Sequence, residues 1–304
     1  MVYHEIRKEN GKKNYLIHNV RKGNKWVKKA KFIGFGEISK NKVRDEKKKF
    51  EKEIIEMIDY DYLSGADVRK IERLREIYNK KINGMKKEEY EKFQKSFFTE
   101  LTYNSNAIEG SSLSLQETSL ILNDGIVPEG KSLREVYEAR NHAEALKFLR
   151  NYKEEFNELF ILKLHKIILK DIGGRFAGRY RETQVKIFGS DVKFPSSEKV
   201  PQMVKNLVYW YKKNKKRFHQ FELVVLVSMK LVTIHPFVDG NGRVSRLIMN
   251  FLLSKKKYPW INVYNKRRQK YLEAVRKANG ENYDLIFPFL IDSLEENLRD
   301  FGFL

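Results

Sequence analysis

The twelve residues from His235 to Arg246, HPFVDGNGRVSR, constrain the fold more than any other segment of the 304-residue chain. An apolar run precedes them from Leu223 to Ile234, and the stretch RVSRLIMNFLL, from Arg243 to Leu253, overlaps their end and reads as a helix. Pro236 disfavours continuation of the first helix, and the GNG triplet lets the backbone turn sharply. The pattern predicts two buried helices joined by a short loop that lies at the N-terminus of the second helix.

The loop has the composition of a phosphate-binding site. Backbone N–H groups around Gly240 and Gly242, at the positive end of a helix, form an anion-binding concavity. Arg243 and Arg246 lie three residues apart, so both can reach phosphate oxygens from one face. The chain has neither a GxxxxGK[ST] loop nor a kinase-type GxGxxG, so the sequence predicts a di- or triphosphate site of another kind.

A carboxylate and an imidazole complete the loop. Asp239 is a hard oxygen ligand, and Mg²⁺ commonly binds one or two carboxylates together with substrate phosphates. His235 titrates near neutrality and is a candidate general base for an incoming hydroxyl. A glycine turn or a histidine at a helix end is usually structural when it occurs alone. The combination with Asp239, Arg243 and Arg246 at fixed spacing favours a catalytic site.

The segment resembles the signature of the Fic family, HPFx(D/E)GNGRxxR, at every defined position. The resemblance implies a helical bundle that transfers AMP from ATP to a protein hydroxyl, with His235 as the base and Asp239 as the ligand of Mg²⁺ or Mn²⁺. It assigns the α-phosphate to Asn241 and Gly242, the β-phosphate to Arg243 and the γ-phosphate to Arg246.

A second segment, SNAIEG from Ser105 to Gly110, resembles the inhibitory motif of autoinhibited Fic proteins, (S/T)xxxE(G/N). An amphipathic helix over about 90–109 is predicted to end there, with Gly110 as its cap. The resemblance implies that Glu109 pairs with Arg246 and blocks productive binding of the triphosphate. Two alternatives stay open: Glu109 is a solvated charge beside a cap, or it is catalytic in the reverse reaction, the removal of AMP from a protein.

A third segment, from Gly174 to Pro195, alternates apolar and polar residues around the turn Gly189-Ser190-Asp191. This pattern predicts a β-hairpin. In Fic relatives such a hairpin, here about 180–195, is a flap that binds the target by strand addition. The alternative is a surface hairpin that closes a long connection.

Two polar residues near the C-terminus also match positions that contact adenine in Fic relatives. Tyr271 and Asn279 lie eight residues apart on one predicted helix. The resemblance implies that they bind the base. The alternative is a packing tyrosine and a helix-ending Asn-Gly pair.

The rest of the chain predicts a mainly α-helical protein with a small N-terminal antiparallel β module. Residues 1–57 comprise a β-meander with turns at Asn10-Gly11 and Gly23-Asn24, followed by the start of a charged helix. Residues 58–304 form the Fic-type helical domain, with the active-site loop at 235–243. Helices are expected over 66–82, 86–109, 114–123, 133–150, 157–171, 200–213, 220–234, 242–255, 267–279 and 283–300.

The N-terminal module is strongly basic. Residues 1–49 contain 16 Lys and Arg against 5 Asp and Glu, and this difference of +11 is about half of the formal net charge of +21. Tyr15, Trp26 and Phe32 are interleaved with these charges, so the module could bind nucleic acid or an acidic partner. The alternative is a solvated sheet in a lysine-rich protein. A regulatory nucleic-acid-binding protein is therefore a second class of function beside the enzyme.

Composition limits the remaining possibilities. The chain has no cysteine, which excludes disulfides and thiolate metal sites. No apolar stretch approaches a membrane span and the start has no signal-like apolar region, so we expect a cytoplasmic protein. Self-association, which is frequent in autoinhibited Fic relatives, and self-modification are further expectations from the resemblance.

Overall fold

The computed structural model describes residues 2–8, 11–22, 25–57, 60–186 and 192–304. The chain forms two compact units, residues 1–73 with 217–219 and residues 74–216 with 220–304. The division after Arg73 lies within a helix, whereas the sequence places the boundary at residue 57. The mainly helical body and the small antiparallel sheet predicted from the sequence are confirmed.

The elements within the described residues are three strands, eleven α-helices and four short helices of other types. Their bounds are β1 Tyr3–Arg7, β2 Lys13–Lys22, β3 Lys25–Phe35, α1 Lys40–Met57, α2 Gly65–Gly84, α3 Lys87–Ile108, α4 Leu115–Ser119, η1 Leu120–Asp124, α5 Leu133–Asn151, α6 Glu158–Ile168, η2 Gly174–Phe176, η3 Ser197–Lys199, α7 Val200–Asn214, α8 Gln220–Ile234, α9 Asn241–Ser254, η4 Asn265–Arg267, α10 Arg268–Asn279 and α11 Ile286–Asp300.

The N-terminal unit contains the predicted meander. The strands are antiparallel in the order β1-β2-β3, with Tyr3 opposite Ile17 and Lys13 opposite Phe35. Asn10 and the Gly23-Asn24 turn lie outside the described residues. One face of the sheet packs against α1, because apolar side chains alternate along the strands and recur at helical spacing on α1. The buried members of this core are Val2, Leu16, Ile33, Phe50 and Ile54.

The aromatic residues that the structure describes in this basic module differ in their accessibility. Phe32 is exposed and its ring lies 5.4 Å from that of Tyr15, which is half-buried. The side chain of Trp26 lies outside the described part of the chain. Nucleic-acid binding by this module stays a prediction.

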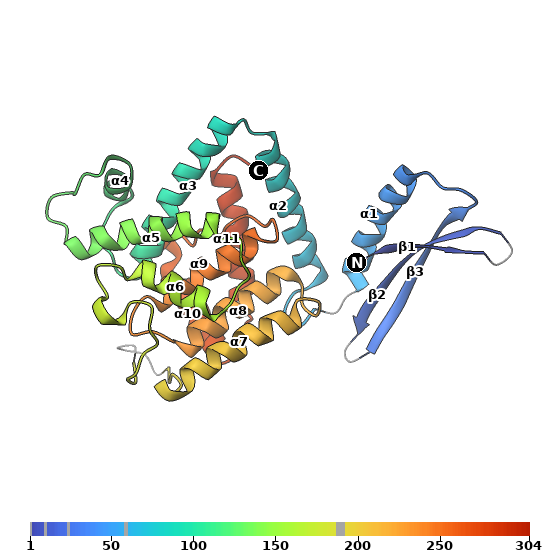
Figure 1. The fold of residues 1–304 in the computed structure, drawn as a ribbon. Helices are drawn as coiled ribbons and strands as arrows, with labels where there is room; N and C mark the ends of the chain where they lie inside the picture. The colour runs from blue at the N-terminus through green and yellow to red at the C-terminus, as the bar shows by residue number, and fades with distance from the viewer. Residues whose placement is uncertain (1, 9–10, 23–24, 58–59, 187–191) are drawn as a thin grey trace. The chain divides into compact units, whose positions relative to one another are not determined.

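The helical unit is built around α9, which Figure 1 shows among α5, α6 and α8. Twelve of the fourteen residues of α9 are buried, as expected for a helix that is enclosed on all sides. Ser228 of α8 and Ser245 of α9 exchange hydrogen bonds through their hydroxyls, which lie 2.8 Å apart. These small side chains let the two helices approach closely, so the loop between them is held by a rigid pair.

The ends of the helices follow the capping signals in the sequence. Gly110, with a φ of +105°, follows α3, and Glu109 is the C-terminal cap residue of that helix. Ser114 and Glu117 form the expected capping box of α4, and Ser132 and Glu135 form another at the start of α5. Glu109 is therefore fixed at a helix end.

Within the described residues, none of the helices combines the length and the apolar character needed to cross a bilayer.

Candidate active site

The loop between α8 and α9 is closed by its own asparagine. The side chain of Asn241 accepts a hydrogen bond from the Phe237 N–H and donates one to the Phe237 carbonyl, each at 2.9 Å. Gly240 is left-handed, with a φ of +79°, and immediately precedes α9. A side chain at this φ would be strained, so glycine is required here. The first N–H groups of α9 have no partner within the helix, and they provide the predicted anion-binding end.

The surroundings of His235 favour the tautomer and the charge state of a general base. It follows α8 with a φ of +50°, and its Nδ1 lies 3.3 Å from the carbonyl of Val232. A proton on Nδ1 can be donated to that carbonyl, which leaves the lone pair on Nε2. The ring stacks on Phe194 with 4.0 Å between centroids. Burial lowers the pKa of His235 to about 4, so the imidazole is neutral at pH 7.

A second histidine, which the sequence analysis missed, positions the loop. His165 of α6 accepts a hydrogen bond at Nδ1 from the Gly178 N–H, at 3.0 Å. Its Nε2 therefore carries the proton and donates to the backbone carbonyl of Asp239, at 3.1 Å. The ring also stacks on Phe237, with 3.6 Å between centroids. His165 thus fixes the backbone at the predicted metal ligand.

The carboxylate of Asp239 is held by two arginines. Nη2 of Arg134, from α5, lies 2.7 Å from Oδ2, and Nη2 of Arg243 lies 3.2 Å from Oδ1. Oδ1 also accepts the N–H of Gly240 at 2.5 Å. The side chain of Asp239 is 42% exposed. The described residues contain no group of three or more His, Cys, Asp and Glu suited to a metal. A single accessible carboxylate beside an anion-binding end fits Mg²⁺, which takes its other ligands from phosphates and water.

Arg243 is buried between two carboxylates. Besides Asp239, its Nη1 lies 3.1 Å from Oε1 of Glu138, a residue of α5. This ion pair lacks the alignment of a hydrogen bond, and among the described residues Nε and Nη1 have no hydrogen-bond partner. Donors that are buried and unsatisfied are costly unless a ligand completes them, so the guanidinium fits a phosphate oxygen.

Glu109 and Arg246 form the predicted pair. Nη2 of Arg246 donates to Oε1 of Glu109 at 2.8 Å, and Ser105 accepts from the same guanidinium through its hydroxyl and its carbonyl. The carboxylate of Glu109 also lies against Gly242, where an added Cβ would collide with Oε1. Glu109 therefore places its negative charge at the N-terminus of α9, the position that the sequence assigns to a phosphate.

Tyr271 lies beside Arg246. It is buried, its ring centroid is 6.0 Å from the guanidinium of Arg246, and its ring packs against Phe289. Burial raises the pKa of Tyr271 while Arg246 opposes the rise. A buried position beside Arg246 favours a role for Tyr271 in orienting that arginine over a role in stacking on a base.

Asn279 lies at the end of α10. Its Oδ1 accepts a hydrogen bond from Thr233 at 2.8 Å, two residues before His235. It also lines a small hollow with Val192 and Lys193, which belong to the predicted flap segment. Contact of Asn279 with the base stays a prediction.

The flap segment differs from the predicted hairpin. The turn at 189–191 lies outside the described residues, and residues 180–186 and 192–195 contain no strand. Side chains connect the two sides of the segment instead of a backbone ladder. Gln184 donates to the carbonyl of Phe194 at 3.0 Å, and Ser197 donates to that of Glu182 at 3.0 Å.

A buried arginine joins this segment to the loop. Arg181 donates to the carbonyls of His235 at 2.8 Å, Thr183 at 3.1 Å and Pro195 at 2.5 Å, and its N–H donates to the carbonyl of Pro236. It thereby fixes the backbone of the candidate base. The sequence reasoning missed Arg181, because one arginine among 61 basic residues carries no signal that it will be buried.

Three imidazoles, of which two are buried and one is half-buried, predict that the fold is sensitive to acid. Burial lowers the pKa of His142 to about 3 and those of His165 and His235 to about 4. The unfolded chain binds these protons near pH 6.5, so the free energy of unfolding falls as the pH drops from 6.5 towards 4, by roughly 2 kcal/mol for each imidazole at pH 5. Urea unfolding at pH 7.5 and 5.0 measures this change. His142→Gln should reduce the dependence by about a third; a urea midpoint that does not change with pH would contradict the prediction.

Comparison with known proteins identifies the class. Residues 155–253, from the start of α6 nearly to the end of α9, match the family model described as Fic/DOC family. The chain therefore contains a Fic domain, and the candidate active site lies within and around it.

The similar proteins share a common name. The chain is 35% identical over 193 residues to a protein named protein adenylyltransferase Fic from Nematostella vectensis, covering 62% of this chain and 44% of the relative. It is 30% identical over 212 residues to a protein of the same name from Aedes aegypti, covering 67% and 42%. The chain thus spans less than half the length of these relatives.

Solved structures have the same fold. Fic-1 from C. elegans (residues 134–508) superposes with a TM-score of 0.69 at 27% identity, covering 78% of this chain and 72% of that one. A Fic domain containing signaling protein from Bacteroides thetaiotaomicron superposes with a TM-score of 0.68 at 27% identity, covering 76% and 96%.

Proposed function

We propose that this chain is an autoinhibited protein adenylyltransferase, which transfers AMP from ATP to a Ser, Thr or Tyr hydroxyl of a protein. The observation that carries the proposal is the contact of Glu109 with Arg246 and Gly242. A phosphate-binding helix end is held by an internal carboxylate, next to a neutral imidazole. The names of the similar proteins support the same reaction.

Each residue has a role that its environment supports. His235 accepts the proton of the target hydroxyl at Nε2 as the oxygen attacks the α-phosphate and pyrophosphate leaves. Arg243 and the N-terminus of α9 bind phosphate oxygens. Asp239 would hold Mg²⁺ or Mn²⁺, and the ion would neutralise phosphate charge. Arg246 binds the γ-phosphate once Glu109 has left it.

The experiment that tests the proposal is mass spectrometry of the protein and of candidate target proteins after incubation with ATP and Mg²⁺. We expect AMP on a hydroxyl side chain, weakly for the wild type and strongly for Glu109→Gly. A chain that leaves no AMP on itself or on any added protein, with either Mg²⁺ or Mn²⁺, would contradict the proposal for the substrates tested.

The second candidate is the removal of AMP from a modified protein. The side chain of Glu109 is 37% exposed, so a water molecule can reach the carboxylate while it still lies at the site. The two reactions differ in what Glu109→Gln does. AMP transfer should increase in this variant, whereas release of AMP from a modified protein should stop.

The metal site leads to a prediction about Arg134. Its guanidinium holds Asp239 at 2.7 Å and is 59% exposed, so the metal must displace a surface ion pair. Arg134→Ala should strengthen binding of Mn²⁺ roughly twofold to fivefold, as expected for the loss of such a pair. Titration followed by electron paramagnetic resonance measures this affinity without any turnover.

Two variants serve as references for the Mn²⁺ titration. Arg140→Ala removes another exposed arginine of α5, which donates to the carbonyl of Gly125 instead, and it should leave Mn²⁺ affinity unchanged. Asp239→Ala should abolish the site. Equal affinities for Arg134→Ala and Arg140→Ala would show that Arg134 does not compete with the metal.

A further inference from the structure

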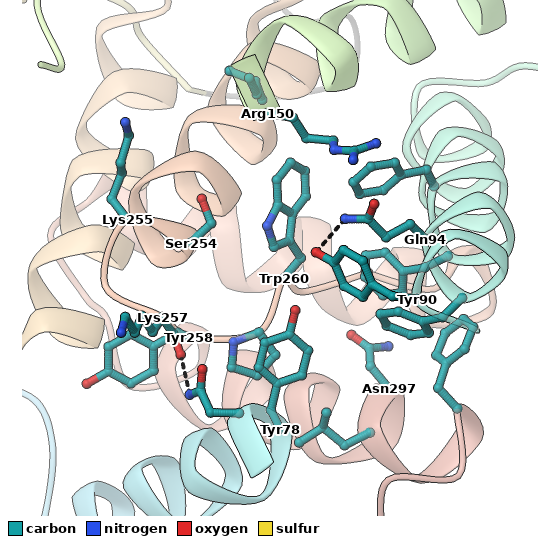
Figure 2. Close-up of a pocket in the computed structure, with 18 of the residues that line it drawn as sticks. Tyr78, Tyr90, Gln94, Arg150, Ser254, Lys255, Lys257, Tyr258, Trp260 and Asn297 are labelled. Carbon is teal, nitrogen blue, oxygen red and sulfur yellow. Dashed lines mark hydrogen bonds between the residues drawn. The ribbon is translucent and has the colours of Figure 1, made fainter. Parts of the chain in front are cut away.

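A cavity of about 400 Å³ lies in the helical unit and shares no lining residue with the loop at 235–246. Its walls come from α2, α3, the end of α5, the segment after α9, α11 and the C-terminal residues (Figure 2). The volume is in the range of small-molecule sites. The lining residues used below are Tyr78, Tyr90, Phe93, Gln94, Phe98, Arg150, Lys153, Ser254, Lys255, Lys257, Trp260 and Phe303.

The walls are mainly aromatic rings. Phe98 and Trp260 lie 5.2 Å apart between centroids, and Phe93 and Phe303 lie 5.0 Å apart. Figure 2 shows the indole of Trp260 in the middle of the lining, between Arg150 and Tyr78. Trp260, Phe93 and Phe98 are half-buried, so their rings keep accessible surface. Faces of this kind favour a flat ligand, because aromatic pairs gain energy beyond the area that they bury.

A few polar groups interrupt the rings. Gln94 donates from Nε2 to the hydroxyl of Tyr90 at 2.6 Å, as Figure 2 shows. Burial raises the pKa of Tyr78, so its hydroxyl stays protonated and can donate. Such groups orient a ligand within an otherwise apolar site.

The charge of the lining has one sign. Arg150, Lys153, Lys255 and Lys257 are exposed cations of the lining, and no Asp or Glu occurs among the described residues that form it. Lys255 lies 2.8 Å from the carbonyl of Tyr152, and burial together with the neighbouring charge of Lys153 lowers its pKa. A group of cations without counter-charges is stabilised by an anion.

We propose that this cavity binds a small aromatic anion, a ring system of two or three fused rings that carries a carboxylate or sulfonate. The rings of the walls receive the flat body, and the cations at the rim bind the acid group. An aliphatic anion would pair with the cations but would not stack on the aromatic rings. The site is separate from the proposed AMP transfer and would operate whether or not that reaction occurs.

The test is calorimetric titration of the whole chain with three probes. These are 1-naphthoate, the cation 1-naphthylmethylammonium and the aliphatic anion decanoate. We expect 1-naphthoate to bind at least roughly tenfold more tightly than either of the other two. Equal affinity for the naphthyl cation would overturn the role of the rim charges. Equal affinity for decanoate would overturn the aromatic specificity, and no heat with 1-naphthoate would overturn the site.

Variants locate the binding. Gln94→Trp and, independently, Ser254→Trp fill the cavity from different walls, and each should weaken 1-naphthoate at least roughly tenfold. Circular dichroism confirms that the variants tested are folded. The pair Arg150→Gln and Lys153→Gln should weaken binding roughly fivefold, whereas Lys212→Gln on α7 should not. Unchanged binding in both folded tryptophan variants would place the probe elsewhere and overturn the proposal.

Discussion

Glu109→Gly is expected to raise the rate of AMP transfer roughly 10-fold to 100-fold, the range that follows from removing one charge-assisted hydrogen bond of about 1.5–3 kcal/mol. The carboxylate holds Arg246 at 2.8 Å and lies against Gly242. Without it, the guanidinium and the N-terminus of α9 are open to the triphosphate. Ser105 still binds Arg246, so the arginine keeps its orientation. Initial rates of label transfer from α-labelled ATP measure the effect.

The effect of the charge of Glu109 on the rate can be distinguished from the effect of its side chain. Glu109→Gln keeps the shape and one hydrogen bond but loses the charge, so it should give an intermediate rate. Glu91→Gln removes an exposed carboxylate from the same helix, which faces Lys87 at 4.0 Å, and should leave the rate unchanged. Rates in both Glu109 variants equal to that of the wild type would show that this contact is not inhibitory.

His235→Ala is expected to lower the rate by about 10²- to 10⁴-fold, the usual contribution of a general base. The comparison is made in the Glu109→Gly background, where the rate is high enough to measure a large loss. Binding of ATP, followed by calorimetry, should persist, because the phosphates are held by α9 and the arginines and not by the imidazole. Loss of ATP binding together with activity would instead assign His235 a structural role.

The pH profile gives an independent check of the same residue. Because burial lowers the pKa of His235 to about 4, kcat/KM of Glu109→Gly should stay level as the pH falls from 8 to 5. An ordinary solvent-exposed histidine would instead lose activity near pH 6.5. A profile that falls near 6.5 would contradict the environment described for His235.

The parts of the structure that the sequence predicted depend on local signals. The helices follow apolar periodicity and caps, and α8 and α9 occur within one residue of the predicted bounds. The turn was predictable because the GNG triplet permits a sharp change of direction, and Gly240 is left-handed in the structure. The hydrogen bonds of Asn241 with Phe237 were not predicted. The pair of Glu109 and Arg246, 137 residues apart, was accessible only through resemblance to a family motif.

The parts that sequence reasoning missed depend on tertiary contacts. Arg134 and His165 come from neighbouring helices and meet Asp239 only because α5 and α6 both pack on α9. Nothing in an isolated SLREVY or LKLHK segment indicates that contact. The flap followed an alternating pattern, yet side-chain hydrogen bonds from Arg181 and Gln184 replace strand pairing in its described residues. An alternating pattern indicates which side chains would lie on opposite faces of a strand. It does not specify which segment that strand would pair with.

The proposed reaction breaks the bond between the α-phosphorus of ATP and the oxygen that bridges to the β-phosphate. The most direct test incubates Glu109→Gly with Mg²⁺ and with ATP that is labelled either at the α- or at the γ-phosphate. We predict that protein gains label from α-labelled ATP, gains none from γ-labelled ATP, and gains none from either in Glu109→Gly with His235→Ala. Transfer of the γ-label, or transfer that persists without His235, would contradict the proposed chemistry.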